Sequence, residues 1–185
     1  MTIYFIRHGL SEGNVAGVFS GFYDHPLTDE GHEQAKRAGK KVAKENMKFD
    51  AIYASPLQRA HNTAKHVASA IDHDLDGIIL RDDIKERNFG SLEGVTGINK
   101  PNFPLTLEEY LNDPFAIDHF DGVETITDLH YRAQKFLEFL ESEPHETVLV
   151  VSHGAFGRAF ERAIKNMPMT ELATNFGNAE MHRLK

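Results

Sequence analysis

Two histidine–glycine pairs, each at the end of a short apolar run, are the residues best placed to do chemistry in this 185-residue chain. Residues 3–6 lead into Arg7-His8-Gly9, and residues 148–151 lead into Ser152-His153-Gly154. Such runs are typical of buried parallel strands, whose functional groups lie just beyond their carboxyl ends. Two imidazoles that meet there could serve phosphoryl chemistry, although a histidine at a strand-to-helix turn can also be purely structural.

Three further segments supply parts that two facing imidazoles would need for that chemistry. Ser55 is predicted to be a helix N-cap with Gln58 as its capping-box partner, which puts Arg59 in the first turns of a helix. Glu86 begins a glycine-punctuated loop, and residues 11–14 directly follow the first histidine–glycine pair. Imidazoles, an arginine and a carboxylic acid together indicate phosphoryl transfer.

Five motifs stand in a fixed order along nearly the whole chain: Arg7-His8-Gly9 with Ser11 and Asn14, Pro26 to Gly31, Ser55 to Ala60 with Thr63-Ala64, Glu86 with Phe89-Gly90 and Leu92-Glu93-Gly94, and Ser152-His153-Gly154. In this order they resemble the histidine phosphatase superfamily, which includes cofactor-dependent phosphoglycerate mutases and many phosphomonoesterases. Five ordered motifs are far more specific than any single tripeptide.

The resemblance implies that His8 is a nucleophile that forms a phosphohistidine in the first of two in-line displacements. Its other ring nitrogen is expected to donate to a backbone carbonyl near Gly9. Arg7, Arg59 and His153 are expected to surround the phosphoryl group as cations and to neutralise its oxygens. Three such cations would make a metal ion unnecessary.

Other residues are expected to contact the substrate. Asn14 and the backbone amide of Gly154, at the start of a predicted helix, can donate further hydrogen bonds to a phosphoryl group. Ser20 and Gly21 match a loop that in related mutases contacts the substrate beyond its phosphate, and ordinary loop packing explains them equally well.

Glu86 matches the proton donor of the family. It would protonate the leaving alkoxide and later activate water, and a bound phosphoryl group with an apolar wall such as Phe89 would favour its protonated form. The structural alternative is a surface salt bridge with Arg87 or Lys85. Poorer candidates for the same role are Glu12, Glu93 and Glu124, the last of which could equally stabilise a helix N-terminus.

The order of apolar segments predicts one α/β domain over residues 1–185, a three-layer sandwich with a mostly parallel central sheet. An alternating stretch at 179–184 suits an edge strand, which the resemblance makes antiparallel. Residues of about 90–122 are expected to form an excursion over the active site, with a short helix at 106–112. Strands are predicted near 2–6, 50–53, 77–80 and 147–151, and helices near 29–46, 57–71, 124–142 and 155–165.

Composition narrows the class of protein. The net charge of −8 argues against nucleic acid as a partner. The absence of cysteine excludes disulfides and thiol chemistry. The sequence indicates neither a membrane partner nor a signal peptide. A cytoplasmic enzyme with a small phosphorylated substrate and no cofactor is expected, and its oligomeric state is open. Eleven histidines suggest a metal site, but His61 and His66 have the wrong helical spacing, so surface histidines are the better explanation.

Hydrolysis is favoured over phosphoryl transfer between substrates, because a mutase needs a second cationic cluster. Residues 87–120 hold two cations, Arg87 and Lys100, against five acids. A cofactor-dependent phosphoglycerate mutase is the alternative, and a phospho-ligand-binding regulatory module is a minor one. Five aromatic residues of this segment could line a lid for apolar substrates, although a role as lid core is favoured: Phe89, Phe103, Tyr110, Phe115 and Phe120.

Overall fold

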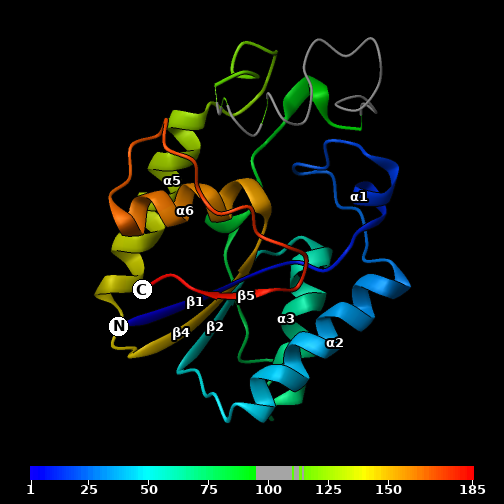
Figure 1. The fold of residues 1–185 in the computed structure, drawn as a ribbon, viewed down its shortest axis with the longest axis vertical. Helices are drawn as coiled ribbons and strands as arrows, with labels where there is room; N and C mark the ends of the chain where they lie inside the picture. The colour runs from blue at the N-terminus through cyan, green and yellow to red at the C-terminus, as the bar shows by residue number, and fades with distance from the viewer. Residues whose placement is uncertain (95–109, 111–112, 114) are drawn as a thin grey trace.

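A central sheet with helices on both faces organises the chain in a computed structural model that describes residues 1–94, 110, 113 and 115–185 (Figure 1). Within these residues the sheet has five strands in the order β3-β2-β4-β1-β5. Four of them are parallel, and β5 runs antiparallel to β1, as predicted. The strands are β1 (Thr2–Arg7), β2 (Ala51–Ala54), β3 (Ile79–Leu80), β4 (Thr147–Ser152) and β5 (Met181–Arg183).

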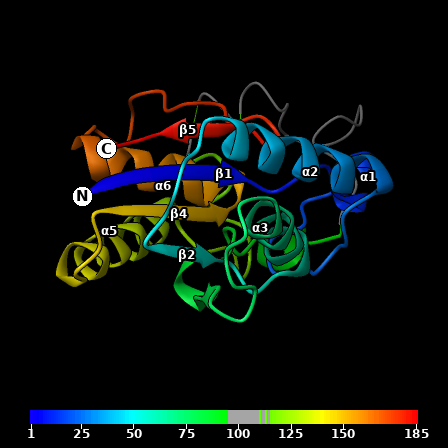
Figure 2. The same ribbon diagram turned by 90° about the horizontal axis from the view of Figure 1, so that it is seen from below.

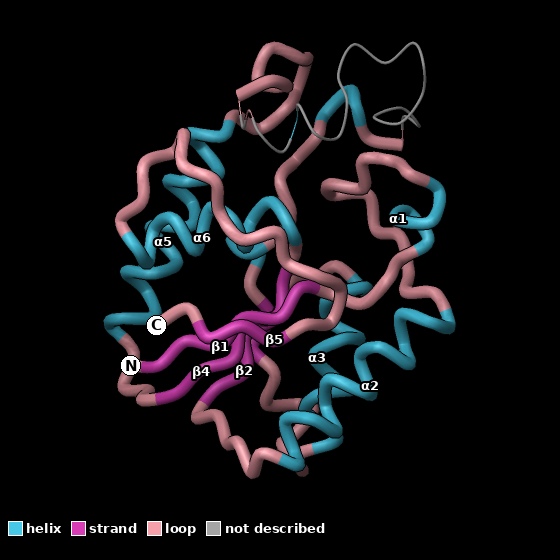
Figure 3. Tube along the Cα trace, in the orientation of Figure 1, coloured by secondary structure: helices cyan, strands magenta, loops and turns pink. Residues whose placement is uncertain are grey.

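Helices flank the strands in two pairs, which Figure 3 shows on opposite sides of the sheet. From below, β5, β1, β4 and β2 follow one another from top to bottom (Figure 2). The predicted three-layer arrangement is therefore confirmed. The described helices are α1 (Glu12–Ala16), α2 (Asp29–Lys44), α3 (Gln58–Ala70), α5 (Ile126–Ser142) and α6 (Gly154–Lys165), with single 3₁₀ turns at η1 (Asp82–Ile84) and η2 (Gly90–Leu92).

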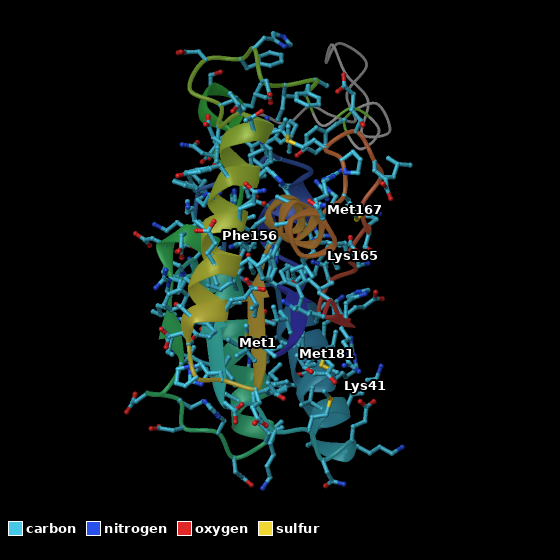
Figure 4. All side chains as sticks on the ribbon, turned by 90° about the vertical axis from the view of Figure 1, so that its left-hand side faces the viewer. Met1, Lys41, Phe156, Lys165, Met167 and Met181 are labelled. Carbon is cyan, nitrogen blue, oxygen red and sulfur yellow. The ribbon has the colours of Figure 1, made fainter. Side chains whose placement is uncertain are left out.

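Alternate residues of the strands bury on opposite faces of the sheet. Phe5 of β1 and Val150 of β4 pack with α5 and α6, whereas Ile6 and Val151 pack with α2 and α3. Phe156 of α6 is labelled beside α5 in Figure 4, and its ring lies 6.1 Å from that of a phenylalanine of α5. Because both faces are covered, the central parts of β1, β2 and β4 are apolar and buried, which fixes the positions of their ends.

The predicted capping box of Ser55 and Gln58 is wrong. Helix α3 begins at Gln58, and its N-cap position is Leu57, whose side chain makes no capping hydrogen bond; the Gln58 amide donates to Asp24 Oδ1 at 2.8 Å. Ser55 instead accepts a hydrogen bond from the Leu57 amide at 3.3 Å, and its hydroxyl lies 2.8 Å from the ring of His153. The Ser55 hydroxyl is therefore part of the site between the strand ends, while Arg59 still falls in the first turn of α3.

The described part of the 90–122 excursion packs around a small apolar cluster of its own. Phe89 and Tyr110 are buried there with Phe19 of the segment after α1, and Phe120 packs against them. Phe89, Tyr110 and Phe120 therefore pack as a lid core, Phe89 and Tyr110 also line the cavity, and Phe115 is exposed. Phe103 and the predicted helix at 106–112, except Tyr110, lie outside the described residues. No helix in the described ranges is long and apolar enough to cross a membrane.

Candidate active site

The carboxyl ends of β1 and β4 bring the two histidine–glycine pairs together. Arg7 is in register with Ser152, and the His8 amide donates to the Ser152 carbonyl at 2.9 Å. The ring centroids of His8 and His153 are consequently 5.2 Å apart, and both residues are almost completely buried. His8 and His153 are 145 positions apart in the sequence. They are neighbours in space because β1 and β4 pair in parallel at the centre of the sheet.

His8 has the tautomer and charge of a nucleophile. Its Nδ1 lies 2.7 Å from the carbonyl oxygen of Gly9, which can only accept, so Nδ1 carries the proton and Nε2 has a free lone pair. Burial lowers the pKa of His8 well below its ordinary value, and the charges of Arg59 and Arg7 lower it further. A side chain at Gly9 would not fit, because its Cβ would lie 2.4 Å from the carbonyl oxygen of Gly31.

His153 differs from the cation expected from the sequence. Burial, followed by the charges of Arg59 and the effect of His8, lowers the pKa of His153 well below its ordinary value. Its Nε2 is 2.8 Å from the Ser55 hydroxyl, whereas Nδ1 is buried without a partner in the described part of the chain. The ring therefore contributes a neutral hydrogen-bonding group, and the positive charge must come from arginines.

Arg7 and Arg59 are held by backbone carbonyls. Arg7 Nη1 donates to the Phe176 carbonyl at 2.9 Å, and Arg59 Nη2 and Nη1 donate to the carbonyls of Gly21 and Tyr23 at 2.8 and 3.0 Å. Within the described residues, the Nε of each arginine is buried without a partner. A buried donor left unsatisfied costs about 1–3 kcal/mol, which acceptor oxygens of a bound anion would offset.

Glu86 is held by the N-terminus of α6. Its Oε1 accepts hydrogen bonds from the amides of Ala155 and Phe156, both at 3.0 Å, and from the Arg87 amide at 2.9 Å. These three amides fix the position of the Glu86 carboxyl group at the N-terminus of α6. The amides of Ala155 and Phe156 are thus taken by Glu86, whereas Gly154, whose amide is expected to bind a phosphoryl group, lines the pocket.

The salt bridges considered for Glu86 do not form. Lys85 pairs with Asp82 at 2.9 Å, and the buried guanidinium of Arg87 pairs with Asp118. Both cations therefore stabilise the surrounding loops, and the Glu86 carboxyl group is directed to the pocket.

Two other glutamates, which the sequence makes only weaker candidates for the proton donor, hold loops and side chains around the site. Glu93 accepts from the amides of Phe22 and Tyr23, at 2.7 and 2.8 Å, and so fixes the loop whose carbonyls hold Arg59. Glu124 binds Arg132 at 2.8 Å. The sequence signal for such roles is weak: Glu93 directly precedes Gly94, and Glu124 follows Gly122 by two residues.

A cavity of about 350 Å³ opens over these groups. Eight of the predicted site residues line it, whereas the buried His153 is not among its lining residues. Asn14 accepts from the Ser11 amide at 3.1 Å through Oδ1, so its amino group is free to donate. The predicted lining residues are Arg7, His8, Asn14, Ser20, Gly21, Arg59, Glu86 and Gly154, and the sequence analysis had not singled out Phe19, Arg158 and Asn175.

Two histidines from α2 and α3 lie side by side. His32 Nδ1 lies 2.9 Å from His66 Nε2 across the two helices. In the described ranges, however, no group of three or more histidine, aspartate or glutamate side chains is arranged to hold a metal ion.

Comparison with known proteins gives the family. Residues 3–185 match the histidine phosphatase superfamily (branch 1). A 2,3-bisphosphoglycerate-dependent phosphoglycerate mutase of Bartonella tribocorum is 32% identical over 179 residues, which cover 92% of this chain and 84% of that protein. The chain therefore belongs to the histidine phosphatase superfamily.

Solved structures of the same superfamily are similar over almost the whole chain. A mutant phosphoserine phosphatase from Entamoeba histolytica in complex with phosphoserine is 27% identical with a TM-score of 0.78, covering 97% of this chain and 88% of that one. Phosphoserine phosphatase from the same organism in complex with 3-phosphoglyceric acid is 29% identical with a TM-score of 0.72, at the same coverage. These neighbours bind small phosphorylated ligands.

Proposed function

We propose that this protein is a metal-independent phosphomonoester hydrolase that acts on small phosphorylated metabolites through a phosphohistidine on His8. The observation that carries the proposal is the neutral, buried ring of His8, whose Nδ1 is fixed by a carbonyl and whose Nε2 is left free beside two arginines. This combination provides a nucleophile at neutral pH together with charge for the transferred group.

In the first step, the Nε2 lone pair of His8 attacks phosphorus while the bond to the leaving oxygen breaks. Arg7 and Arg59 bind the equatorial oxygens through their unpartnered Nε atoms, and Asn14 adds a further donor. Glu86, as the general acid, gives a proton to the leaving oxygen. The alcohol product then leaves a phosphohistidine and a Glu86 carboxylate.

In the second step, water replaces the alcohol. The Glu86 carboxylate, held by the amides of α6, removes a proton from the water as its oxygen attacks phosphorus. The phosphorus–nitrogen bond breaks, the electron pair returns to His8 Nε2, and inorganic phosphate is released. Glu86 has regained its proton, so one carboxyl group serves both steps.

The alternative, a cofactor-dependent phosphoglycerate mutase, is supported by the names of the sequence relatives. Hydrolysis is supported by the phosphatases among the structural neighbours and by the charges of the excursion. Arg87 is engaged by Asp118 rather than directed to the pocket, and Lys100 lies outside the described residues. A mutase must also hold its bisphosphate and exclude water from the phosphohistidine, which needs more cations than this segment supplies.

One experiment separates hydrolysis from the mutase reaction. The substrate is 3-phosphoglycerate, with 2,3-bisphosphoglycerate as a primer. Phosphorus NMR follows inorganic phosphate and 2-phosphoglycerate in the same sample, with His8→Ala as the inactive control. Phosphate release faster than isomerisation is expected. Isomerisation faster than phosphate release would assign the mutase reaction instead, and phosphate binding without any turnover would indicate the regulatory module.

A further inference from the structure

Arg132 of α5, to which the mechanism above gives no task, uses every donor of its guanidinium around the loop that carries Glu86. Nε and Nη2 donate to the two carboxylate oxygens of Glu124, at 2.9 and 2.8 Å. Nη1 donates to the carbonyls of Asp83 and Lys85, at 2.9 and 2.8 Å, and Nη2 also donates to the carbonyl of Glu86 at 3.2 Å. A guanidinium has five N–H donors, and each of them has an acceptor here.

The carbonyl groups of residues 83–86 depend on side chains for their hydrogen bonds. This segment leaves a single 3₁₀ turn and continues as an irregular loop, so no helix or strand supplies donors to it. Arg132 binds three of the four carbonyls, and the Ser152 hydroxyl donates to the fourth, that of Ile84, at 2.6 Å. The backbone that leads into Glu86 is therefore fixed by α5 and by the end of β4.

Glu124 holds the same loop on the other side of Glu86. Its Oε2 also accepts a hydrogen bond from the Asn88 amide at 3.1 Å, and its amide donates to the Asn88 carbonyl at 2.9 Å. The side chains of Arg132 and Glu124 are only 18% and 16% exposed. A bidentate pair between a guanidinium and a carboxylate fixes direction as well as distance. The Arg132–Glu124 pair thus holds the backbone both before and after Glu86.

Arg132 itself does not reach the reacting groups. It is not among the described residues that line the cavity, and it binds the Glu86 backbone carbonyl, whereas the Glu86 carboxyl group is bound by the amides of α6. The guanidinium carbon of Arg132 also lies 5.4 Å from the centroid of the Phe156 ring, in the first turn of α6. One side chain therefore contacts both the loop that carries Glu86 and the helix that binds its carboxyl group.

We propose that Arg132, paired with Glu124, is the positioning residue of Glu86. This inference rests on the proposed function and adds to it a residue outside the cavity. A general acid must lie within hydrogen-bond reach of the leaving oxygen, and a displacement of about 1 Å can cost about 100-fold in rate. Arg7 and Arg59 are held by other carbonyls, so the binding of the phosphoryl group does not depend on Arg132. Loss of its contacts should therefore slow the proton transfers of Glu86 and spare substrate affinity.

Arg132→Lys tests the assignment, because it keeps the charge but has too few donors for three carbonyls and a bidentate carboxylate. With glycerol 3-phosphate, kcat should fall about 10- to 100-fold while KM changes less than about threefold. Phosphorylation of the enzyme by para-nitrophenyl phosphate, whose phenolate leaves without a proton, should change less than about threefold in pre-steady-state measurements. Glu124→Gln, which keeps its shape and the carbonyl contacts of Arg132, should show the same selectivity with a smaller loss.

Asp50→Ala is the matched control for a general loss of stability. Asp50 accepts from the amides of Glu146 and Thr147, both at 2.8 Å, at the amino end of β4 and away from the cavity. This variant should leave the ratio of the rates with the two substrates unchanged. Equal losses of phosphorylation with both substrates in Arg132→Lys would overturn the inference, because general loosening of the site, and not displacement of the acid, would then explain them.

The Glu86→Gln background separates positioning from a merely structural role. The group to be positioned is absent there, so Arg132→Lys should cause no further loss of glycerol 3-phosphate hydrolysis. A further loss as large as that in the wild-type background would contradict the inference. Glu86→Gln alone tests the proposed function instead: if it slows neither substrate, the acid role itself fails, whereas a normal Glu86→Gln result with an additive Arg132→Lys loss removes only the role of Arg132.

Discussion

Lowering the pH should destabilise the folded protein, because His8 and His153 are buried as neutral rings that would be charged in the unfolded chain. Burial next to Arg59 holds the pKa of both well below the ordinary value of 6.5. Below pH 6.5 the unfolded chain therefore binds more protons than the folded protein, and the free energy of unfolding falls as the pH falls. This loss of stability is small well above pH 6.5 and grows steadily as the pH falls below it.

The size of the effect follows from proton linkage. A histidine that stays neutral in the fold loses about 1.4 kcal/mol of stability at pH 5.5 and about 0.2 kcal/mol at pH 7.0. The two rings together should therefore lower the free energy of unfolding by about 2.5 kcal/mol between these pH values. For a chain of this length, the corresponding shift of the melting temperature is about 5–10 °C.

Urea denaturation at pH 7.0 and pH 5.5 measures this loss. His8→Gln and His153→Gln should each reduce the difference between the two pH values by about 1.2 kcal/mol. Each variant has its own stability at pH 7.0, so only the difference is compared. His119→Gln, at an exposed position, is the matched control and should leave the difference unchanged. The same loss in wild type, His8→Gln and His153→Gln would refute the conclusion that the buried rings are neutral.

Three further predictions concern the site. Glu86→Gln should slow hydrolysis of alkyl phosphates by about two to four decades. Phosphorylation of the enzyme by an activated aryl phosphate should be spared and should give a burst of product. Equal losses of the phosphorylation rate for both substrate classes in pre-steady-state measurements would remove Glu86 from the acid role. Glu93→Gln should raise KM and lower stability by about 1–3 kcal/mol, because the amides that support the Arg59 carbonyl ligands lose a charged acceptor, and an unchanged KM would contradict this. Hydrolysis of an aryl phosphate should persist in chelator, since the proposed charges come from side chains, whereas strict recovery on adding a divalent ion would argue for a metal.

The sheet was predictable because its signals are local. Apolar runs such as residues 148–151 need burial on both faces of a sheet. They therefore predicted the central strands, and the helical segments between these runs predicted the alternation of strands and helices. Strand β3 (Ile79–Leu80) is shorter than the strand predicted near 77–80, and both of its residues are exposed. Helix α1, which carries a capping box of Ser11 and Asn14, was missed because its five residues are too few for a periodic pattern.

What the sequence could not provide depends on contacts between distant segments. Ser55 fits an N-cap locally, but the ring of His153 lies next to its hydroxyl. The charge of His153 follows from its burial next to arginines, which no spacing reveals. Arg158 lines the cavity from one helical turn after Gly154, outside the segment between residues 87 and 120 in which the sequence analysis weighs the cations.

The central claim is that the phosphoryl group passes through His8. Rapid mixing with phosphorus-labelled substrate and a quench without acid should trap label on the protein that is acid-labile and alkali-stable, as a phosphoramidate is. The label should map to His8 and form at least as fast as the substrate turns over. In His8→Ala both label and turnover should be absent. Substantial turnover in His8→Ala, or label on another residue at the catalytic rate, would contradict the account.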